Sequence, residues 1–197
     1  NINKMLIPAI RESAHGTLTA VASRTPEKAS AYADEWDIPL AFGSYLEMFD
    51  SGEIDVVYIS LPNHLHAEWS IKAMRTGLHV LCEKPLAITL TECKAMIQTS
   101  RQTGMKLAEA FMYRHHPQTL LVKQWIDSGK IGQVLLVQGD FHFPLPESRR
   151  QAEHLDIRLI PEYGGGSLWD VGVYPISFAQ MVLEEIPEKV SGCKRNG

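Results

Sequence analysis

Short apolar runs alternate with longer amphipathic segments from residue 18 to residue 112, and this alternation constrains the fold more than any other feature. The strand-like runs lie at 18–22, 38–41, 54–59, 78–81 and 106–109. The segments between them have the length and apolar spacing of helices. Strands that alternate with helices in this way build a parallel sheet through right-handed crossovers. The pattern predicts a doubly wound α/β domain that ends near Met112.

Capping residues mark the ends of several predicted helices. Thr25 precedes Pro26, which is the order expected of an N-cap followed by the first helical residue. Thr89 and Glu92 have the spacing of a capping box. Gly77 stands where a helix ends, as glycine commonly does. These local signals favour helices on both sides of the apolar run 78–81.

The pattern changes after residue 113. The sequence predicts a helix over 117–127, a long strand over 134–143, a loop over 144–163 and a helix over 167–184. This mixture indicates the start of a second, α+β domain.

Composition and charge exclude several classes of function. The net charge is -4, with 19 Lys and Arg against 23 Asp and Glu, which gives no reason to expect a nucleic-acid partner. No apolar run approaches the roughly 18 residues that span a bilayer, so no membrane partner is expected. Cys82, Cys93 and Cys193 form no Cys-x-x-Cys pair, which fits free thiols in a cytoplasmic protein. His64 and His66 lie two residues apart and do not face each other on a helix, so no metal site is predicted.

The turn Glu83-Lys84-Pro85 follows a predicted strand directly. Ligands of doubly wound folds bind beyond the carboxyl ends of the strands. A lysine at that edge can donate hydrogen bonds to a substrate oxygen, and its charge favours a developing alkoxide. Glu83 can hold or tune Lys84. The alternative is a surface Lys–Glu pair in a turn.

A second candidate lies at Ser23 and Arg24, after the run 18–22. In dinucleotide folds an acidic residue here pairs with the ribose hydroxyls of NAD, whereas Arg and Ser accommodate the 2′-phosphate of NADP. The stretch 17–26 contains no acid, and Lys28 lies one helical turn further on. These residues favour NADP over NAD. The alternative is an exposed polar turn that caps the next helix.

The third candidate is the pair Asp170 and Tyr174. Residues four apart on a helix share one face, so the two side chains can point into one cleft as an acid–base pair. The alternative is an aspartate that answers the helix dipole and a tyrosine packed in the core.

Taken together, these segments resemble the glucose–fructose oxidoreductase and inositol dehydrogenase family over nearly the whole chain. They are, in family order, Val21-Ala22-Ser23-Arg24, Asp55-Val56-Val57-Tyr58-Ile59, Leu61-Pro62-Asn63-His64-Leu65-His66, His79-Val80-Leu81-Cys82-Glu83-Lys84-Pro85-Leu86, Glu109-Ala110-Phe111-Met112-Tyr113-Arg114 and Gly165-Gly166-Ser167-Leu168-Trp169-Asp170-Val171-Gly172-Val173-Tyr174. The resemblance implies a Rossmann-like dinucleotide-binding domain over 1–112 and an α+β substrate domain over 113–197. It implies hydride transfer between NAD(P) and a sugar, polyol or diol, and homo-oligomers that form through the C-terminal sheet.

The resemblance also assigns roles. Lys84 is the catalytic lysine near the nicotinamide, and Asp170 and Tyr174 match the family's catalytic segment. The residues that it assigns to the cofactor are Leu61, Pro62, Asn63, His66, Glu83 and Arg114, with Ser23, Arg24 and Lys28 at the adenosine end. Many members carry His where this chain has Tyr174. With tyrosine at this position, the segment resembles the branch of the family that contains NADP-dependent D-xylose dehydrogenase and dimeric dihydrodiol dehydrogenase. In oxidation, Tyr174 is expected to accept the hydroxyl proton, while Lys84 polarises the oxygen and lowers the pKa of Tyr174.

Two departures from the family pattern limit this prediction. The family's first strand and Gly-rich phosphate loop have no counterpart, and residues 1–10 match the helix that follows that loop. The C-terminal sheet is cut short. We therefore expect a truncated chain that binds NADP poorly, because that loop holds the pyrophosphate. A redox-silent NADP sensor and an inactive fragment are the alternatives. Basic residues of the loop 143–164 can meet a polar substrate or can be solvated loop charges, and they are Arg149, Arg150, His154 and Arg158.

Overall fold

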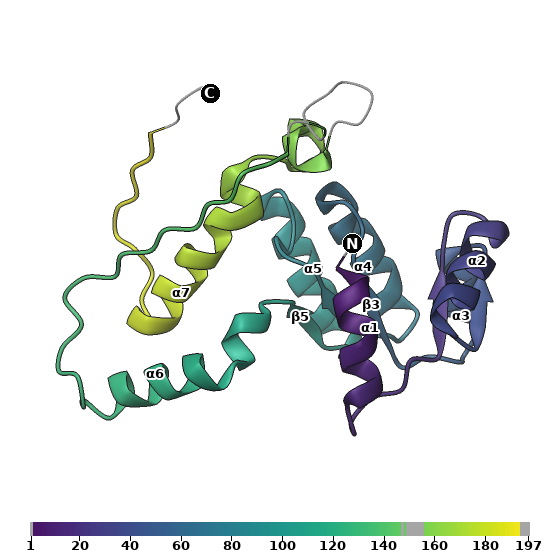
Figure 1. Cartoon of the computed structure of the whole chain (residues 1–197), viewed down its shortest axis with the longest axis horizontal. Coiled ribbons are helices and arrows are strands. Elements are labelled where there is room, and N and C mark those ends of the chain that lie inside the picture. Colours follow the sequence, from purple (N-terminus) through teal and green to yellow (C-terminus); the bar gives the residue numbers. More distant parts are fainter. Residues whose placement is uncertain (1, 147, 149–155, 194–197) are drawn as a thin grey trace.

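The computed structural model describes residues 2–146, 148 and 156–193 of the 197-residue chain. Its elements are, in chain order, α1 (Asn3–Glu12), β1 (Ala20–Ala22), α2 (Pro26–Trp36), β2 (Leu40–Phe42), α3 (Tyr45–Asp50), β3 (Val56–Ile59), η1 (Asn63–Leu65), α4 (His66–Arg75), β4 (His79–Cys82), α5 (Leu90–Thr103), β5 (Leu107–Glu109), η2 (Met112–His115), α6 (Pro117–Asp127), η5 (Ile157–Leu159), η6 (Pro161–Tyr163), η7 (Leu168–Gly172) and α7 (Val173–Leu183). The order confirms the predicted alternation of strands and helices up to β5 (Figure 1).

The predicted helix caps are present. The side chain of Thr25 accepts a hydrogen bond from the Lys28 backbone N–H at the start of α2. Thr89 and Glu92 form the reciprocal capping box that opens α5. Gly77 follows α4 with a φ of 90°, a conformation that glycine adopts without steric cost. These ends are set locally, which is why the sequence predicts them well.

The parallel sheet is present in two pieces. β1 pairs with β2, and β3, β4 and β5 form a second sheet in that order. Every pairing is parallel, and the registers join Ala20 to Leu40, Val56 to His79 and Val80 to Leu107. The carboxyl ends of β3, β4 and β5 therefore lie along one edge. This is the Rossmann-like α/β arrangement that the alternation predicts.

A cavity of about 900 Å³ lies between the two pieces of the sheet. Residues of β1 and β3 line it from both sides, and Ile7 of α1 and Phe49 of α3 also contribute. In the doubly wound strand order, a further strand lies between a first pair and a second set of strands. The cavity occupies that position in the described part of the chain.

The main core lies beneath β3 and β4, where α4 and α5 cover the sheet. Met74 of α4, Met96 of α5 and Cys82 of β4 are fully buried there. The α3 helix joins this core through aromatic contacts, because the ring of Tyr45 packs edge-on against Trp69 at 4.7 Å between centroids. Side-chain packing thus connects the two pieces of the sheet although no backbone ladder does.

The predicted strand over 134–143 is wrong. The structure shows an extended segment without a strand there, in which Leu135 and Leu136 are 87% and 78% exposed. A strand needs a neighbouring strand to pair its backbone groups, and none of the described residues supplies one. The segment instead runs against α7, since a Cβ built on Gly139 would lie 2.9 Å from Pro175 Cβ.

The predicted helix over 167–184 is present in two parts. It opens with a π-helical turn, η7, and continues as α7 to Leu183. No helix in the described part of the chain has both the length and the apolar character needed to cross a bilayer.

Core packing gives a direct test of this fold. We expect Met74→Ala to lower the free energy of unfolding by about 2–5 kcal/mol, because it leaves a cavity in the packed core. Met5→Ala is the matched control, since Met5 is 75% exposed on α1 and its loss should change stability little. Urea unfolding followed by circular dichroism measures both. Equal effects of the two substitutions would contradict the assigned core.

Candidate active site

The turn after β4 is held by two carboxylates. The Glu83 carboxylate accepts hydrogen bonds from the Tyr58 hydroxyl and from the Lys84 backbone N–H, the latter at 3.3 Å. Glu109, at the end of β5, accepts the Leu86 backbone N–H at 2.8 Å. Burial raises the pKa of the Glu109 carboxyl. The peptide bond between Lys84 and Pro85 is cis. The side chains of Tyr58 on β3 and Glu109 on β5 therefore fix the position of the turn that carries Lys84.

His66 lies behind this edge rather than on it. Its side chain is fully buried. Nδ1 lies 2.8 Å from the Pro85 carbonyl oxygen, and Nε2 lies 2.8 Å from the Leu61 carbonyl oxygen. The imidazole thereby connects the turn after β3 to the turn after β4. Its predicted place along the cofactor stays a prediction, and the contacts in the structure position the two turns.

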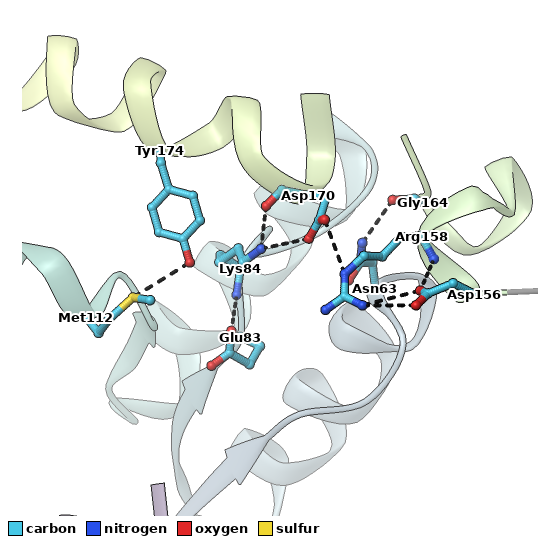
Figure 2. Close-up of polar contacts among 9 residues, drawn as sticks. All are labelled: Asn63, Glu83, Lys84, Met112, Asp156, Arg158, Gly164, Asp170 and Tyr174. Carbon is cyan, nitrogen blue, oxygen red and sulfur yellow. Dashed lines mark hydrogen bonds and ion pairs between the residues drawn. The ribbon is translucent and has the colours of Figure 1, made fainter. Parts of the chain in front are cut away.

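Lys84 meets the C-terminal part of the chain at Asp170, 86 residues further on. The ammonium Nζ donates to the backbone carbonyl of Asp170 at 2.5 Å and to its Oδ1 at 3.2 Å (Figure 2). It also lies 5.1 Å from the centroid of the Tyr174 ring. The side chains of Lys84 and Asp170 are only 15% and 16% exposed. The structure thus brings the three residues Lys84, Asp170 and Tyr174 together.

A cavity of about 530 Å³ opens beside these three residues. Its wall is rich in aromatic side chains, which we call the aromatic wall: Tyr113, Phe141, Phe143, Tyr174 and Phe178. The Phe141 and Tyr174 rings pack edge-on at 5.4 Å between centroids. Such a cavity presents apolar ring faces with a few polar groups at one end, which is the usual form of a small-molecule site.

Tyr174 is a neutral phenol in this environment. Burial raises the pKa of its hydroxyl to about 12, and the negative charges of Glu83 and Asp170 act in the same direction. The hydroxyl donates to the Met112 sulfur at 3.7 Å. The expected lowering of this pKa by Lys84 is therefore wrong. The reason is that the Lys84 charge is paired with Asp170 and lies over the ring.

A glycine-rich loop carries Asp170 to the strand edge. The Gly164 carbonyl accepts a hydrogen bond from Asn63 Nδ2 at 2.9 Å, and the Tyr163 ring stacks on His64 at 4.4 Å. A Cβ on Gly164 would lie 2.3 Å from Ile88 Cγ2. Only a glycine allows this close approach. The predicted residues Leu61, Pro62 and Asn63 thus form the strand end on which the loop rests.

The adenosine-end candidates lie on the other piece of the sheet. Ser23 follows β1, and its backbone N–H donates to the Phe42 carbonyl at 3.0 Å. Arg24 and Lys28 are exposed at the start of α2. The nearby Glu27 carboxyl has a lowered pKa because it accepts a backbone N–H bond and a bond from Thr25 at the helix start.

Arg114 is engaged away from this edge. Its Nε and Nη2 donate to the Ser177 hydroxyl and carbonyl of α7, each at 3.2 Å. Its predicted cofactor contact therefore stays a prediction. Arg149, Arg150 and His154 lie outside the described residues. The described residues hold no group of three or more side chains suited to a metal ion.

Sequence reasoning left Arg158 open as a residue that meets a polar substrate or as a solvated loop charge, and it missed the ion pair with Asp170. The structure places its Nε 3.2 Å from Asp170 Oδ2. It also missed the Tyr58 contact with Glu83 and the Glu109 contact with Leu86. The positions of Tyr58 and Glu109 on the two strands that flank β4 were the available signal, whereas no local pattern points to the ion pair of Arg158 with Asp170.

A parallel α/β fold with a Lys, an Asp and a Tyr gathered at the strand ends defines the Rossmann class of oxidoreductases. The chain belongs to the oxidoreductase family with an NAD-binding Rossmann fold, which residues 1–111 match. Residues 119–196 match the GFO/IDH/MocA C-terminal domain. The family predicted from the sequence segments is therefore confirmed.

The chain is also similar to several individual members of this family. It is 44% identical over 180 residues to D-xylose 1-dehydrogenase (NADP(+)) 2 of Haloferax volcanii, covering 91% of this chain and 53% of the relative. It is 37% identical over 175 residues to trans-1,2-dihydrobenzene-1,2-diol dehydrogenase of Danio rerio, covering 88% and 50%. A 3-ketoreductase from Actinomadura kijaniata, solved with NADP and TDP-benzene, superposes with a TM-score of 0.72 at 33% identity, covering 90% and 52%. The chain spans about half the length of the relatives it matches.

The state of Tyr174 can be measured directly. We expect its hydroxyl to titrate above the ordinary value of 10.0, because burial raises its pKa to about 12. NMR of ¹³Cζ-labelled tyrosine follows the titration, with the signal assigned by its loss in Tyr174→Phe. The urea-unfolded chain is the control and should titrate near the ordinary value. Ionisation of folded Tyr174 at or below pH 10 would show that the site is not arranged as described.

Proposed function

We propose that the protein containing this chain is an NADP-dependent oxidoreductase. It transfers a hydride between nicotinamide and the alcohol or carbonyl carbon of a sugar, polyol or trans-dihydrodiol. One observation carries the proposal: the Lys84 ammonium, held by Asp170, lies beside the Tyr174 ring at the mouth of an aromatic cavity. This arrangement stands at the carboxyl ends of parallel strands, where such folds bind their ligands.

The chain's own residues handle the substrate oxygen and its proton. When bound, NADP supplies or takes up the hydride at the substrate carbon. Lys84 donates a charge-assisted hydrogen bond to the oxygen and stabilises negative charge that develops on it. The protonated phenol of Tyr174 gives its proton to that oxygen during reduction and takes it back during oxidation. Asp170 fixes the ammonium in place through Oδ1.

The residues at the end of β1 fit the adenosine end of NADP. Ser23 supplies a hydroxyl, and Arg24 and Lys28 are exposed cations that can pair with a 2′-phosphate. The relatives from H. volcanii and A. kijaniata, which are named or solved with NADP, support the same cofactor.

The cavity supports a ring-shaped substrate. Its aromatic wall offers flat apolar faces to the C–H face of a sugar ring or to a dihydrodiol ring. The named substrates of the relatives, D-xylose and trans-1,2-dihydrobenzene-1,2-diol, are of these kinds. We infer a dinucleotide-binding part over 1–112 and a substrate part over 113–197. The cysteines Cys82, Cys93 and Cys193 are free, which fits a cytoplasmic enzyme, and oligomerisation through the C-terminal part stays a prediction.

Substitution of the two proposed proton and charge donors tests this function. In an active protein that contains the chain, Lys84→Ala and Tyr174→Phe should each lower kcat by about 10²–10⁴-fold, because a donor to the reacting oxygen is lost. Oxidation of sugars and diols is followed by NADPH absorbance. Lys94→Ala, at an exposed position on α5, is the matched control and should turn over normally.

Two outcomes would contradict the proposal. Near-native turnover in either site variant would remove Lys84 or Tyr174 from the chemistry. Tight NADP binding without turnover on any sugar or diol in the screen would instead identify a redox-silent NADP sensor.

A further inference from the structure

The Asp170 carboxylate is shared between two cations. Its Oδ1 lies 3.2 Å from Lys84 Nζ, and its Oδ2 lies 3.2 Å from Arg158 Nε. On its other side, Arg158 Nη1 lies 3.3 Å and 3.2 Å from the two carboxylate oxygens of Asp156. Figure 2 shows the resulting row of alternating charges, which runs from Lys84 through Asp170 and Arg158 to Asp156.

The backbone around Arg158 is also held by hydrogen bonds. Asp156 caps η5 by accepting the Arg158 backbone N–H at 3.0 Å, and its side chain is only 8% exposed. The Arg158 carbonyl accepts the Gly166 N–H at 2.7 Å. A Cβ on Gly165 would lie 2.7 Å from that carbonyl oxygen, so the glycine loop is packed directly against it. Arg158 therefore has a defined place in the site, with 44% of its side chain exposed to solvent.

Sharing a carboxylate changes what each cation experiences. A carboxylate that lies between two cations divides its electrostatic attraction between them. Here Arg158 Nε lies 3.2 Å from Oδ2, while Lys84 Nζ meets Oδ1 and the backbone carbonyl of Asp170. The positive charge of Arg158 also offsets part of the negative charge beside Lys84.

We propose that Arg158 is a positioning residue that, by holding Oδ2 of Asp170, limits the hold of Asp170 on Lys84. The Lys84 ammonium thereby stays available to a substrate oxygen in the 530 Å³ cavity, which both Lys84 and Arg158 line. This inference rests on the proposed role of Lys84 in the reaction. Arg158, which precedes the glycine-rich loop, thereby joins Lys84, Asp170 and Tyr174 in the proposed site. Its ion pair with Asp156 holds it there.

The reactivity of Lys84 toward an acylating reagent tests the proposal on the chain itself. Only the uncharged amine attacks acetic anhydride, with acetate as the leaving group. In Arg158→Ala a nearby cation is lost and both oxygens of Asp170 become free for Lys84, and both changes favour the ammonium form. We expect trace acetylation of Lys84, quantified by peptide mass spectrometry, to slow by roughly threefold to tenfold. Acetylation of exposed Lys94 in the same sample is the internal reference.

Two further variants fix the sign and the specificity of this effect. Asp170→Asn removes the anion and should speed acetylation of Lys84, opposite to the effect of Arg158→Ala. Arg158→Lys keeps a cation beside Asp170 and should restore part of the original rate. Circular dichroism establishes that each variant is folded. If Arg158→Ala fails to fold, the comparison is made between Arg158→Gln and Arg158→Lys.

An unchanged or faster rate in a folded Arg158→Ala or Arg158→Gln variant would overturn the proposal. The assay needs neither cofactor nor turnover. A chain that oxidises no sugar or diol can therefore still show the shared carboxylate, and failure of the proposed function remains distinct from failure of this inference.

Discussion

The ion pair between Lys84 and Asp170 is the contact on which the candidate site depends. It joins the turn after β4 to the start of the last helix, and both side chains are largely withdrawn from water. A buried charge left without its partner is strongly destabilising, so each residue constrains the other. The surrounding structure positions both partners of this ion pair. Glu83 and Glu109 hold the turn that carries Lys84, and the glycine-rich loop leads to Asp170.

Burial and the charges around this pair explain why the Tyr174 hydroxyl keeps its proton. Burial is the largest cause of the raised pKa of this hydroxyl, and the negative charges of Glu83 and Asp170 act in the same direction. The cation that could oppose them, Lys84, is paired with Asp170, and Arg158 shares the same carboxylate. The site thus presents a protonated phenol and an ammonium to one cavity, a combination that suits transfer of charge and a proton at a single oxygen.

The elements that the sequence predicts correctly are those that local interactions determine. The strand and helix order up to β5, the Thr25 cap and the Thr89–Glu92 capping box depend on neighbours within a few residues. The family segments also place Lys84, Asp170 and Tyr174 in one site, which the structure brings together. The strand predicted over 134–143 depends on a pairing partner that local sequence does not specify. Likewise, the ion pair of Arg158 with Asp170 and the direction of the Tyr174 pKa shift depend on tertiary geometry.

A double-mutant cycle on Lys84 and Asp170 measures how strongly the two side chains stabilise each other in the folded chain. The free energy of unfolding is measured by urea titration for the original chain, Lys84→Met, Asp170→Asn and the double variant. Because the two groups are in contact and largely buried, we expect a coupling free energy of about 1–3 kcal/mol. Additive effects of the two substitutions, with no coupling, would contradict it.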